Sequence, residues 1–243
     1  MIKRKFFALT SLITALCLPL FAYTDSFRAT TVDPDFIRLI TLIRNDESES
    51  KVIEAHQAYI SSGITDVERC RAEGLLARFY KDQNNKNEAN KHISNMKSLF
   101  NSLKNISELE KLVCEIELTS ADFYVNRNLG VGMDNSNLSK KLYSKYPDEI
   151  FSAFTEAWRL IFTPAIAGGS PKKALAILDQ LTKEYGDKLT DIDRYTLLCA
   201  YAIAYNARGD YKKADSYFTE AFTYFKGEES VLEVYRENLK KLS

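Results

Sequence analysis

Residues 195–228 read YTLLCAYAIAYNARGDYKKADSYFTEAFTYFKGE, and this stretch decides the fold of the chain. Apolar residues recur in it at spacings of three and four on both sides of a turn at Gly209-Asp210-Tyr211, which places them on one face of each of two helices. They are Leu198, Tyr201, Ala202 and Tyr205 before the turn, and Ala214, Phe218 and Ala221 after it. Small residues where two helices touch, with large ones beside them, allow close packing, so the stretch predicts an antiparallel helical pair.

Two other stretches repeat this scheme, and the three together resemble tetratricopeptide repeats. Residues 155–188 carry Trp158 in the first helix, then Ala174, Leu178 and Leu181 in the second. Residues 70–103 carry Leu76, Ala77 and Tyr80, followed by Ala89, Ile93 and Met96. Glu73 departs from the pattern, because the family usually has Trp or Leu there, and Lys226 stands where it often has Pro. The segments 107–146 and 34–62 are degenerate candidates for two further repeats.

The whole chain after the amino-terminal segment reads as helix after helix. It has only nine Gly and five Pro, too few to punctuate a sandwich or barrel with its frequent turns. The expected helices cover 34–44, 49–61, 67–82, 87–103, 107–129, 136–146, 192–208, 211–226 and 229–242, with one that starts at Asp148 and stops before Pro164 and one that Ser170-Pro171 opens. The resemblance implies an all-α fold over residues 34–243: a right-handed superhelical array of antiparallel helix pairs, closed by a capping helix at 229–242.

The first 22 residues have the build of a secretory signal peptide. A short cationic start is followed by an uncharged apolar run from Phe6 to Leu18, and Ala22 is a small residue before a polar stretch. We therefore expect export to the periplasm or cell envelope, with residues 23–33 left as a short linker. Two alternatives stay open, and they are the only membrane attachment that we expect: lipidation of Cys17, or retention of the apolar run as an uncleaved anchor.

The composition of the chain limits the kinds of partner and of chemistry that we expect. The chain has a net charge of zero, and removal of residues 1–22, which hold three cations and no acid, leaves about −3, so nucleic acid is not an expected partner. Cys70, Cys114 and Cys199 are odd in number and lie in apolar helical stretches, which indicates buried thiols, although one pair can bridge in an oxidising compartment. The two histidines, His56 and His92, lack metal-ligand spacing. No phosphate loop, nucleophile elbow or assignable catalytic set occurs, so we predict no cofactor and no catalysis.

The resemblance also implies where a partner would bind. In tetratricopeptide arrays the first helix of each pair lines a concave surface that receives peptides or helices. Polar residues beside the buried stripe of those helices are Arg71, Arg78, Lys81, Glu156, Arg159 and Asn206. Because Arg forms bidentate bonds with carboxylates, we hypothesise that this groove binds an acidic protein segment.

The connector at residues 163–169 is unusual because it is apolar, whereas connectors normally run over the surface. It either folds inward as packing or presents Ile166 to a partner. The leading interpretation of the whole chain is a non-catalytic protein-binding scaffold or adaptor of the cell envelope. The alternatives are a small-ligand binding component of a transporter, which a deep pocket at Arg78, Tyr80 and Arg159 would favour, and an enzyme, which titratable groups converging on a histidine would favour.

Overall fold

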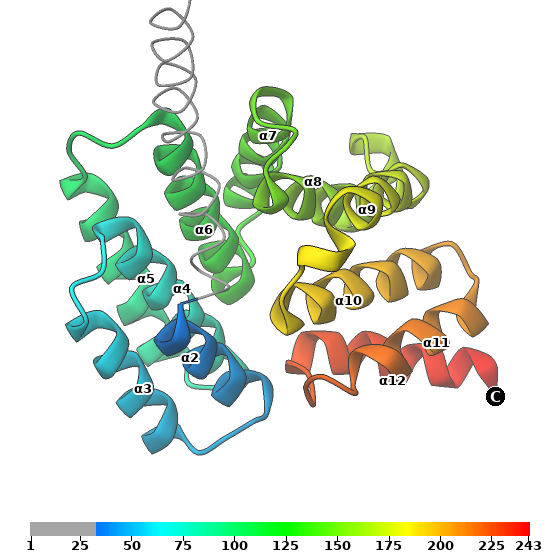
Figure 1. Cartoon of the computed structure of the whole chain (residues 1–243), viewed down its shortest axis with the longest axis horizontal. Coiled ribbons are helices and arrows are strands. Elements are labelled where there is room, and N and C mark those ends of the chain that lie inside the picture. Colours follow the sequence, from blue (N-terminus) through cyan, green and yellow to red (C-terminus); the bar gives the residue numbers. More distant parts are fainter. Residues whose placement is uncertain (1–32) are drawn as a thin grey trace, which may run out of the picture.

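A computed structural model describes residues 33–243, and these residues form eleven α-helices, two short 3-10 helices and no strand (Figure 1). The predicted signal peptide, Cys17 and nearly all of the predicted linker lie outside the described residues. The α-helices are α2 (Pro34–Arg44), α3 (Glu49–Ser61), α4 (Asp66–Asp82), α5 (Lys86–Ser102), α6 (Glu108–Asn126), α7 (Leu129–Lys145), α8 (Ile150–Phe162), α9 (Pro171–Tyr185), α10 (Asp191–Ala207), α11 (Tyr211–Ala221) and α12 (Glu229–Leu242). The 3-10 helices are η1 (Ala165–Ala167) and η2 (Gly186–Lys188). Within residues 33–243 no helix is both long and apolar enough to span a bilayer.

Side-chain caps fix where the helices begin. A capping box starts α6: the Ser107 Oγ accepts the Glu110 N–H, and the Glu110 carboxylate accepts the Ser107 N–H. Thr65 and Thr190 start α4 and α10 in the same way. The predicted start at Ser170-Pro171 is confirmed, since Ser170 Oγ accepts the Lys173 N–H. Each cap satisfies amide groups that have no partner within the first turn of a helix.

The region between α6 and α7 departs from the sequence-based prediction. We expected a helix to residue 129, a polar turn and a short helix at 136–146, but α6 ends at Asn126 and α7 already begins at Leu129. Arg127 turns the chain in the left-handed conformation at φ 55°, and the Asn128 side chain caps α7. Gly132 lies within α7, at a position where a Cβ would approach the Phe123 ring to 2.8 Å. This glycine serves close packing of α7 on α6 rather than a turn.

Consecutive helices pack as pairs, which fits a helical repeat array. Figure 1 shows α4 against α5, α8 beside α9 and α10 against α11, and each pair also contacts the next. One core fills α2–α6 and another fills α8–α12, with fully buried alanines such as Ala77, Ala157 and Ala214 at the crossings. Trp158 packs between helices as predicted.

The capping helix differs from the prediction in one detail. Val231, Val234 and Tyr235 of α12 pack against the last pair, as expected. Leu239 is 42% exposed, however, and Asn238 is the residue that is fully buried. Its amide accepts a bond from Asn206 at 3.0 Å and donates one to the Tyr211 carbonyl at 3.1 Å. The last helix is therefore fixed by a buried polar contact as well as by apolar packing.

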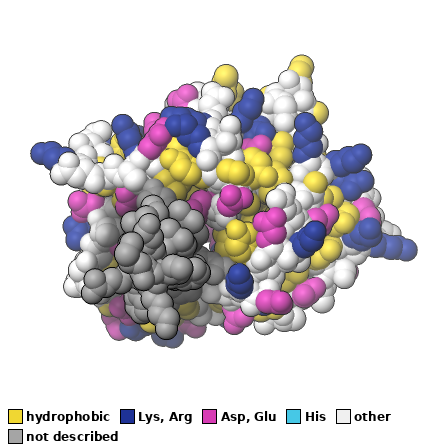
Figure 2. Space-filling model, turned by 45° about the horizontal axis from the view of Figure 1, so that its top comes forward, with side chains coloured by type: hydrophobic (Ala, Val, Ile, Leu, Met, Phe, Trp, Pro, Cys, Tyr) yellow, Lys and Arg dark blue, Asp and Glu magenta, His cyan; other side chains and the backbone are white. Residues whose placement is uncertain are grey.

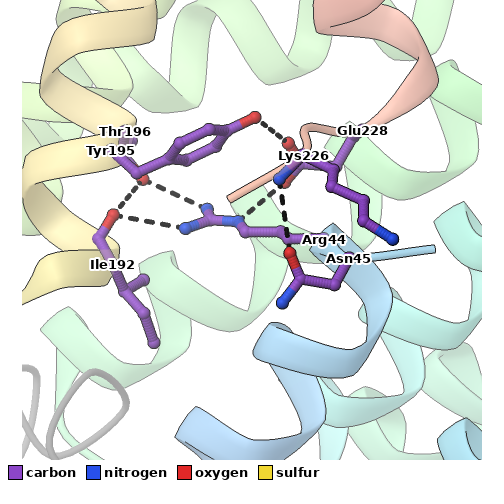
Figure 3. Close-up of polar contacts among 7 residues, drawn as sticks. All are labelled: Arg44, Asn45, Ile192, Tyr195, Thr196, Lys226 and Glu228. Carbon is purple, nitrogen blue, oxygen red and sulfur yellow. Dashed lines mark hydrogen bonds and ion pairs between the residues drawn. The ribbon is translucent and has the colours of Figure 1, made fainter. Parts of the chain in front are cut away.

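The two ends of the array touch each other. A third core joins Phe36 and Ile40 of α2 to Tyr195 and Leu198 of α10, together with Phe225. Figure 3 shows the polar part, which we call the closure contact and which comprises Arg44, Asn45, Ile192, Tyr195, Thr196, Lys226 and Glu228. The Gly227 N–H also donates to the Arg44 carbonyl at 3.0 Å. The described helices thus curl until the first pair meets the last.

Arg44 is the centre of the closure contact (Figure 3). Its Nε donates to Glu228 Oε1 at 2.8 Å, while its two terminal nitrogens reach the Ile192 carbonyl and the Thr196 hydroxyl. The guanidinium also lies 4.5 Å from the centroid of the Tyr195 ring, and the Tyr195 hydroxyl donates to Glu228 Oε2. Burial alone would raise the pKa of Glu228, but Arg44 and Tyr195 outweigh it and hold that pKa below its usual value.

Candidate binding groove

The structure does not bring the six predicted site residues together. Arg71 and Arg78 lie on the inner side of α4 and are held by the chain itself. Arg71 forms an ion pair with Glu117 of α6, Nε to Oε1 at 3.4 Å, and its side chain is only 10% exposed. Arg78 donates to the Ser120 hydroxyl at 2.7 Å. Neither arginine can turn to a partner without leaving a contact inside the fold.

Two other predicted residues, Asn206 and Lys81, also have internal or separate positions. Asn206 donates to Asn238 and so holds the capping helix. Lys81 is half-buried near the end of α4 and does not lie beside Glu156 or Arg159 in any cavity described below. The proposed pocket of Arg78, Tyr80 and Arg159 is not formed, because Tyr80 is buried against His92 and Arg159 lies on α8. The small-ligand alternative therefore loses the pocket on which it depended.

Glu156 and Arg159 do lie together on α8. The Arg159 guanidinium donates two parallel bonds to the Glu156 carboxylate, at 2.7 and 2.8 Å. Both side chains are about as buried as core residues, at 9% and 10% exposed. These hydrogen bonds raise the pKa of Arg159 and neutralise the pair locally.

This ion pair forms the floor of a groove of about 630 Å³ between α7, α8 and α9. We call it the α7–α9 groove. Its walls come from α7 on one side and from η1 and α9 on the other. The lining residues are Ser136, Asn137, Lys140, Tyr143, Glu156, Arg159, Leu160, Ala167, Gly168, Lys173, Ala176 and Ile177.

The charge of the groove is positive. Arg159 is matched by Glu156, but Lys140 on the α7 wall and Lys173 on the α9 wall are exposed and form no ion pair with any residue from 33 to 243. Burial, followed by the nearby negative charge of Glu156, raises the pKa of Tyr143. That phenol therefore stays protonated and can donate a hydrogen bond. The walls thus offer two ammonium groups and a hydroxyl donor to anything that lies between them.

The connector after α8 runs outward, not inward. Ile166 in η1 is fully exposed, so the packing interpretation of residues 163–169 is wrong and the side chain is presented to the surroundings. The adjacent Ala167 and Gly168 line the α7–α9 groove.

Sequence reasoning missed a buried polar cluster around Glu73. The Glu73 carboxylate lies between His56 Nε2 at 3.3 Å and His92 Nδ1 at 2.8 Å, and the Asn95 amide donates to it at 2.8 Å. Burial would raise the pKa of Glu73, but these hydrogen bonds outweigh it and hold the pKa well below its usual range. The only signal in the sequence was an acid at a repeat position that is usually apolar.

Titratable groups do converge on the histidines, yet the cluster is closed. The Glu73, His56 and His92 side chains are all buried, and neither histidine lines the α7–α9 groove. In the described part of the chain, no set of three or more His, Cys, Asp or Glu side chains is arranged to hold a metal ion. The position of the cluster between α3, α4 and α5 indicates a role in packing these helices.

All three described cysteines are free and buried. Cys70 of α4 and Cys114 of α6 are neighbours, and the hydrogen bond between them, together with burial, raises the pKa of the Cys70 thiol. Burial likewise raises the pKa of Cys199 to about 12. The sulfurs of Cys70 and Cys199 are therefore held as neutral thiols rather than as reactive thiolates.

Comparisons with protein-family models, with curated proteins and with solved structures return no match for this chain. The candidate site therefore rests on its own geometry.

Proposed function

We propose that this protein is a non-catalytic scaffold that binds an acidic segment of another protein in the α7–α9 groove. One observation carries the proposal: the groove is open and its two wall lysines, Lys140 and Lys173, have no acidic partner among the described residues. Arg71 and Arg159, two of the cations that the sequence singled out, are already paired with acids of the chain. A carboxylate-bearing segment would provide the charge that the groove lacks.

The setting and family of this scaffold are part of the same proposal. The cationic and apolar leader supports export to the cell envelope. The helix pairs with buried alanines at their crossings support a right-handed array of the tetratricopeptide type. In such an array the α7–α9 groove lies between the second helix of one pair and both helices of the next.

A small ligand is the second candidate, because a volume of about 630 Å³ falls within the range of about 300–1,000 Å³ that is common for small-molecule pockets. The two unpaired charges of the groove stand on opposite walls, however. An extended partner reaches both walls, so the protein segment is the better fit.

The test is chemical crosslinking in cells with the full chain carrying a carboxyl-terminal tag, followed by mass spectrometry. The groove variant is Lys140→Glu/Lys173→Glu, and the matched control is Lys212→Glu/Lys241→Glu, which changes the charge equally at exposed positions of α11 and α12. We expect a protein that the native chain and the control capture and that the groove variant loses. Equal capture by the groove variant would contradict the proposal. Retention of a metabolite by the native chain alone, with no captured protein, would favour the small ligand.

A further inference from the structure

Large apolar side chains are exposed mainly in one part of the molecule. Six such residues stand out among residues 33–243, and four of them belong to α7, α8 and η1. They are Leu129 at 77%, Met133 at 68%, Phe162 at 64% and Ile166 at 100% exposed. The other two, Leu239 and Leu242, lie on the capping helix. Single exposed apolar residues are ordinary, but four on neighbouring elements mark a surface that meets something.

These four residues belong to elements that form the α7–α9 groove, although they are not among the residues that line it. Helices α7 and α8 are antiparallel neighbours, so the start of α7, with Leu129 and Met133, lies beside the end of α8, with Phe162. Ile166 directly precedes Ala167, which lines the groove. We call these four residues the apolar end of the groove. Figure 2, with the top of Figure 1 brought forward, shows hydrophobic side chains at the tips of two protrusions and Lys or Arg side chains close by.

The apolar end continues the lining of the groove along α7. Residues 129, 133, 136, 140 and 143 follow one another at steps of four and three, so they form one stripe on that helix. The stripe begins with the two exposed apolar residues and continues with Ser136, Lys140 and Tyr143 of the groove wall. A partner lying along α7 would meet apolar contacts first and an ammonium group about two turns later.

The local structure fixes the exposed side chains in place. The Ser170 N–H donates to the Leu160 carbonyl at 2.8 Å, which ties the end of the connector to α8. The Gly169 N–H donates to the Pro164 carbonyl at 3.1 Å, which closes the connector on itself. A Cβ at Gly169 would lie 1.6 Å from the Thr163 carbonyl oxygen, so the loop needs glycine there. Phe162 stacks on Trp158 with ring centroids 5.6 Å apart. The connector and the Trp158 ring therefore hold Ile166 and Phe162 in their exposed positions.

We infer that the partner segment is an amphipathic helix that carries both acidic and large apolar residues. This inference rests on the proposed function and names the chemistry of its partner. The acidic residues meet Lys140 and Lys173, and the apolar residues cover Met133, Phe162 and Ile166. The stripe from Leu129 to Tyr143 spans about 21 Å at 1.5 Å per residue, which matches roughly four turns of a bound helix.

The shape of the site favours a helix over a membrane surface. Helices α7 and α9 both pack on α8, and the space between them is a trough of about 630 Å³. A rod-shaped segment fills such a trough by ordinary helix packing. A flat bilayer would cover the rim and leave the trough, with Arg159 and Glu156 in its floor, without contact.

The experiment selects displayed random 16-residue peptides on the full chain and measures the affinity of the synthesised winners by fluorescence anisotropy. The apolar variant is Met133→Ser/Ile166→Ser, and its matched control is Leu239→Ser/Leu242→Ser, which removes two exposed leucines from α12. The charge variant is Lys140→Glu/Lys173→Glu. Because all these positions are exposed, unfolding midpoints are expected to stay unchanged.

We expect winners with Asp or Glu together with Leu, Ile or Phe at helical spacing, which gain helical circular dichroism on binding. Their affinity should fall roughly tenfold or more in the apolar variant and in the charge variant, and remain unchanged in the control. If only the charge variant weakens binding, the apolar-helix inference is overturned while the proposed function stands. If neither variant weakens binding, or no peptide is enriched, both are overturned.

Two further measurements guard against other occupants. Co-sedimentation with phosphatidylglycerol vesicles that depends on Met133 and Ile166 would identify the apolar end as a lipid contact and overturn the inference. Self-association of the native chain that the apolar variant abolishes would identify the occupant as a second copy, with the same consequence. We expect neither result.

Discussion

The inner face of α4 and the α7–α9 groove both carry cations, but the two regions use them in opposite ways. On the inner face, Arg71 is matched by Glu117 and by the Phe36 and Phe151 rings. In the groove, Lys140 and Lys173 are exposed and form no ion pair with the described residues. Desolvation explains the difference, because a buried cation is tolerated only when it is paired. Position relative to the core, rather than residue type, therefore separates structural cations from those free to bind a partner.

The largest expected effect comes from removing a cation that, like Arg71, is paired inside the fold: Arg44, the centre of the closure contact. Arg44→Ala leaves the Glu228 carboxylate without its ion-pair partner in a contact where the Arg44 and Glu228 side chains are 13% and 26% exposed. Breaking such a pair from one side costs about 3 kcal/mol of unfolding free energy. Urea denaturation followed by circular dichroism measures it. Arg38→Ala is the control, since its pair with Glu54 is largely exposed and we expect a change below about 1 kcal/mol. Equal effects for the two variants would mean that the closure contact does not stabilise the array.

A smaller effect is expected at the buried cluster, and it depends on pH. The folded-state pKa of Glu73 lies below its unfolded value, so its stabilisation is complete above the unfolded pKa of about 4.3 and is lost as pH falls below that value. Glu73→Gln should lower the unfolding free energy at pH 7 by about 1–3 kcal/mol. It should also flatten the loss of stability between pH 4.5 and pH 3, because the titrating group is absent. Urea midpoints across this pH range provide the measurement, and an unchanged pH slope would show that the cluster is not the acid-sensitive element.

The smallest expected effect sharpens the contrast between the two regions directly. Arg71→Ala removes an ion pair of the inner face, so we expect a loss of about 1–2 kcal/mol of stability. Capture of the crosslinked partner should remain unchanged, because Arg71 does not line the α7–α9 groove. Lys140→Glu/Lys173→Glu should give the reverse: unchanged stability and lost capture. If the folded Arg71→Ala protein no longer captures the partner, the partner binds at the inner face of α4 and not in the α7–α9 groove.

Local patterns carried the sequence-based prediction of the helices. The Ser170-Pro171 start and the periodic apolar stripes act over a few residues, so the chain shows them directly. The start of α7 was missed for a physical reason. Gly130 and Gly132 resemble a turn in sequence, and only the nearby Phe123 ring shows why a glycine is needed inside the helix.

Contacts between distant parts of the chain could not be predicted in this way. Arg44 and Glu228 are separated by 184 positions, and no periodicity links them. The candidate site was predicted only in part: Glu156 and Arg159 do line the groove, but Lys140 and Lys173 looked like ordinary surface residues of second helices. Their importance comes from the absence of acidic neighbours in space, which a sequence does not record.

The closure contact has a consequence for the order in which the protein completes its fold. Repeat arrays with free ends fold through nearest neighbours, and each new pair can add to the last as the chain is synthesised. Here α2 emerges among the first described helices, yet the partners of Arg44 include Glu228, which is made near the end. The apolar face that α2 presents to Tyr195 and Phe225 therefore stays open while the middle of the chain is synthesised. Helix α2 gains its full set of contacts only after the last part of the chain has been synthesised. The first and last described helices therefore complete their packing at the same stage.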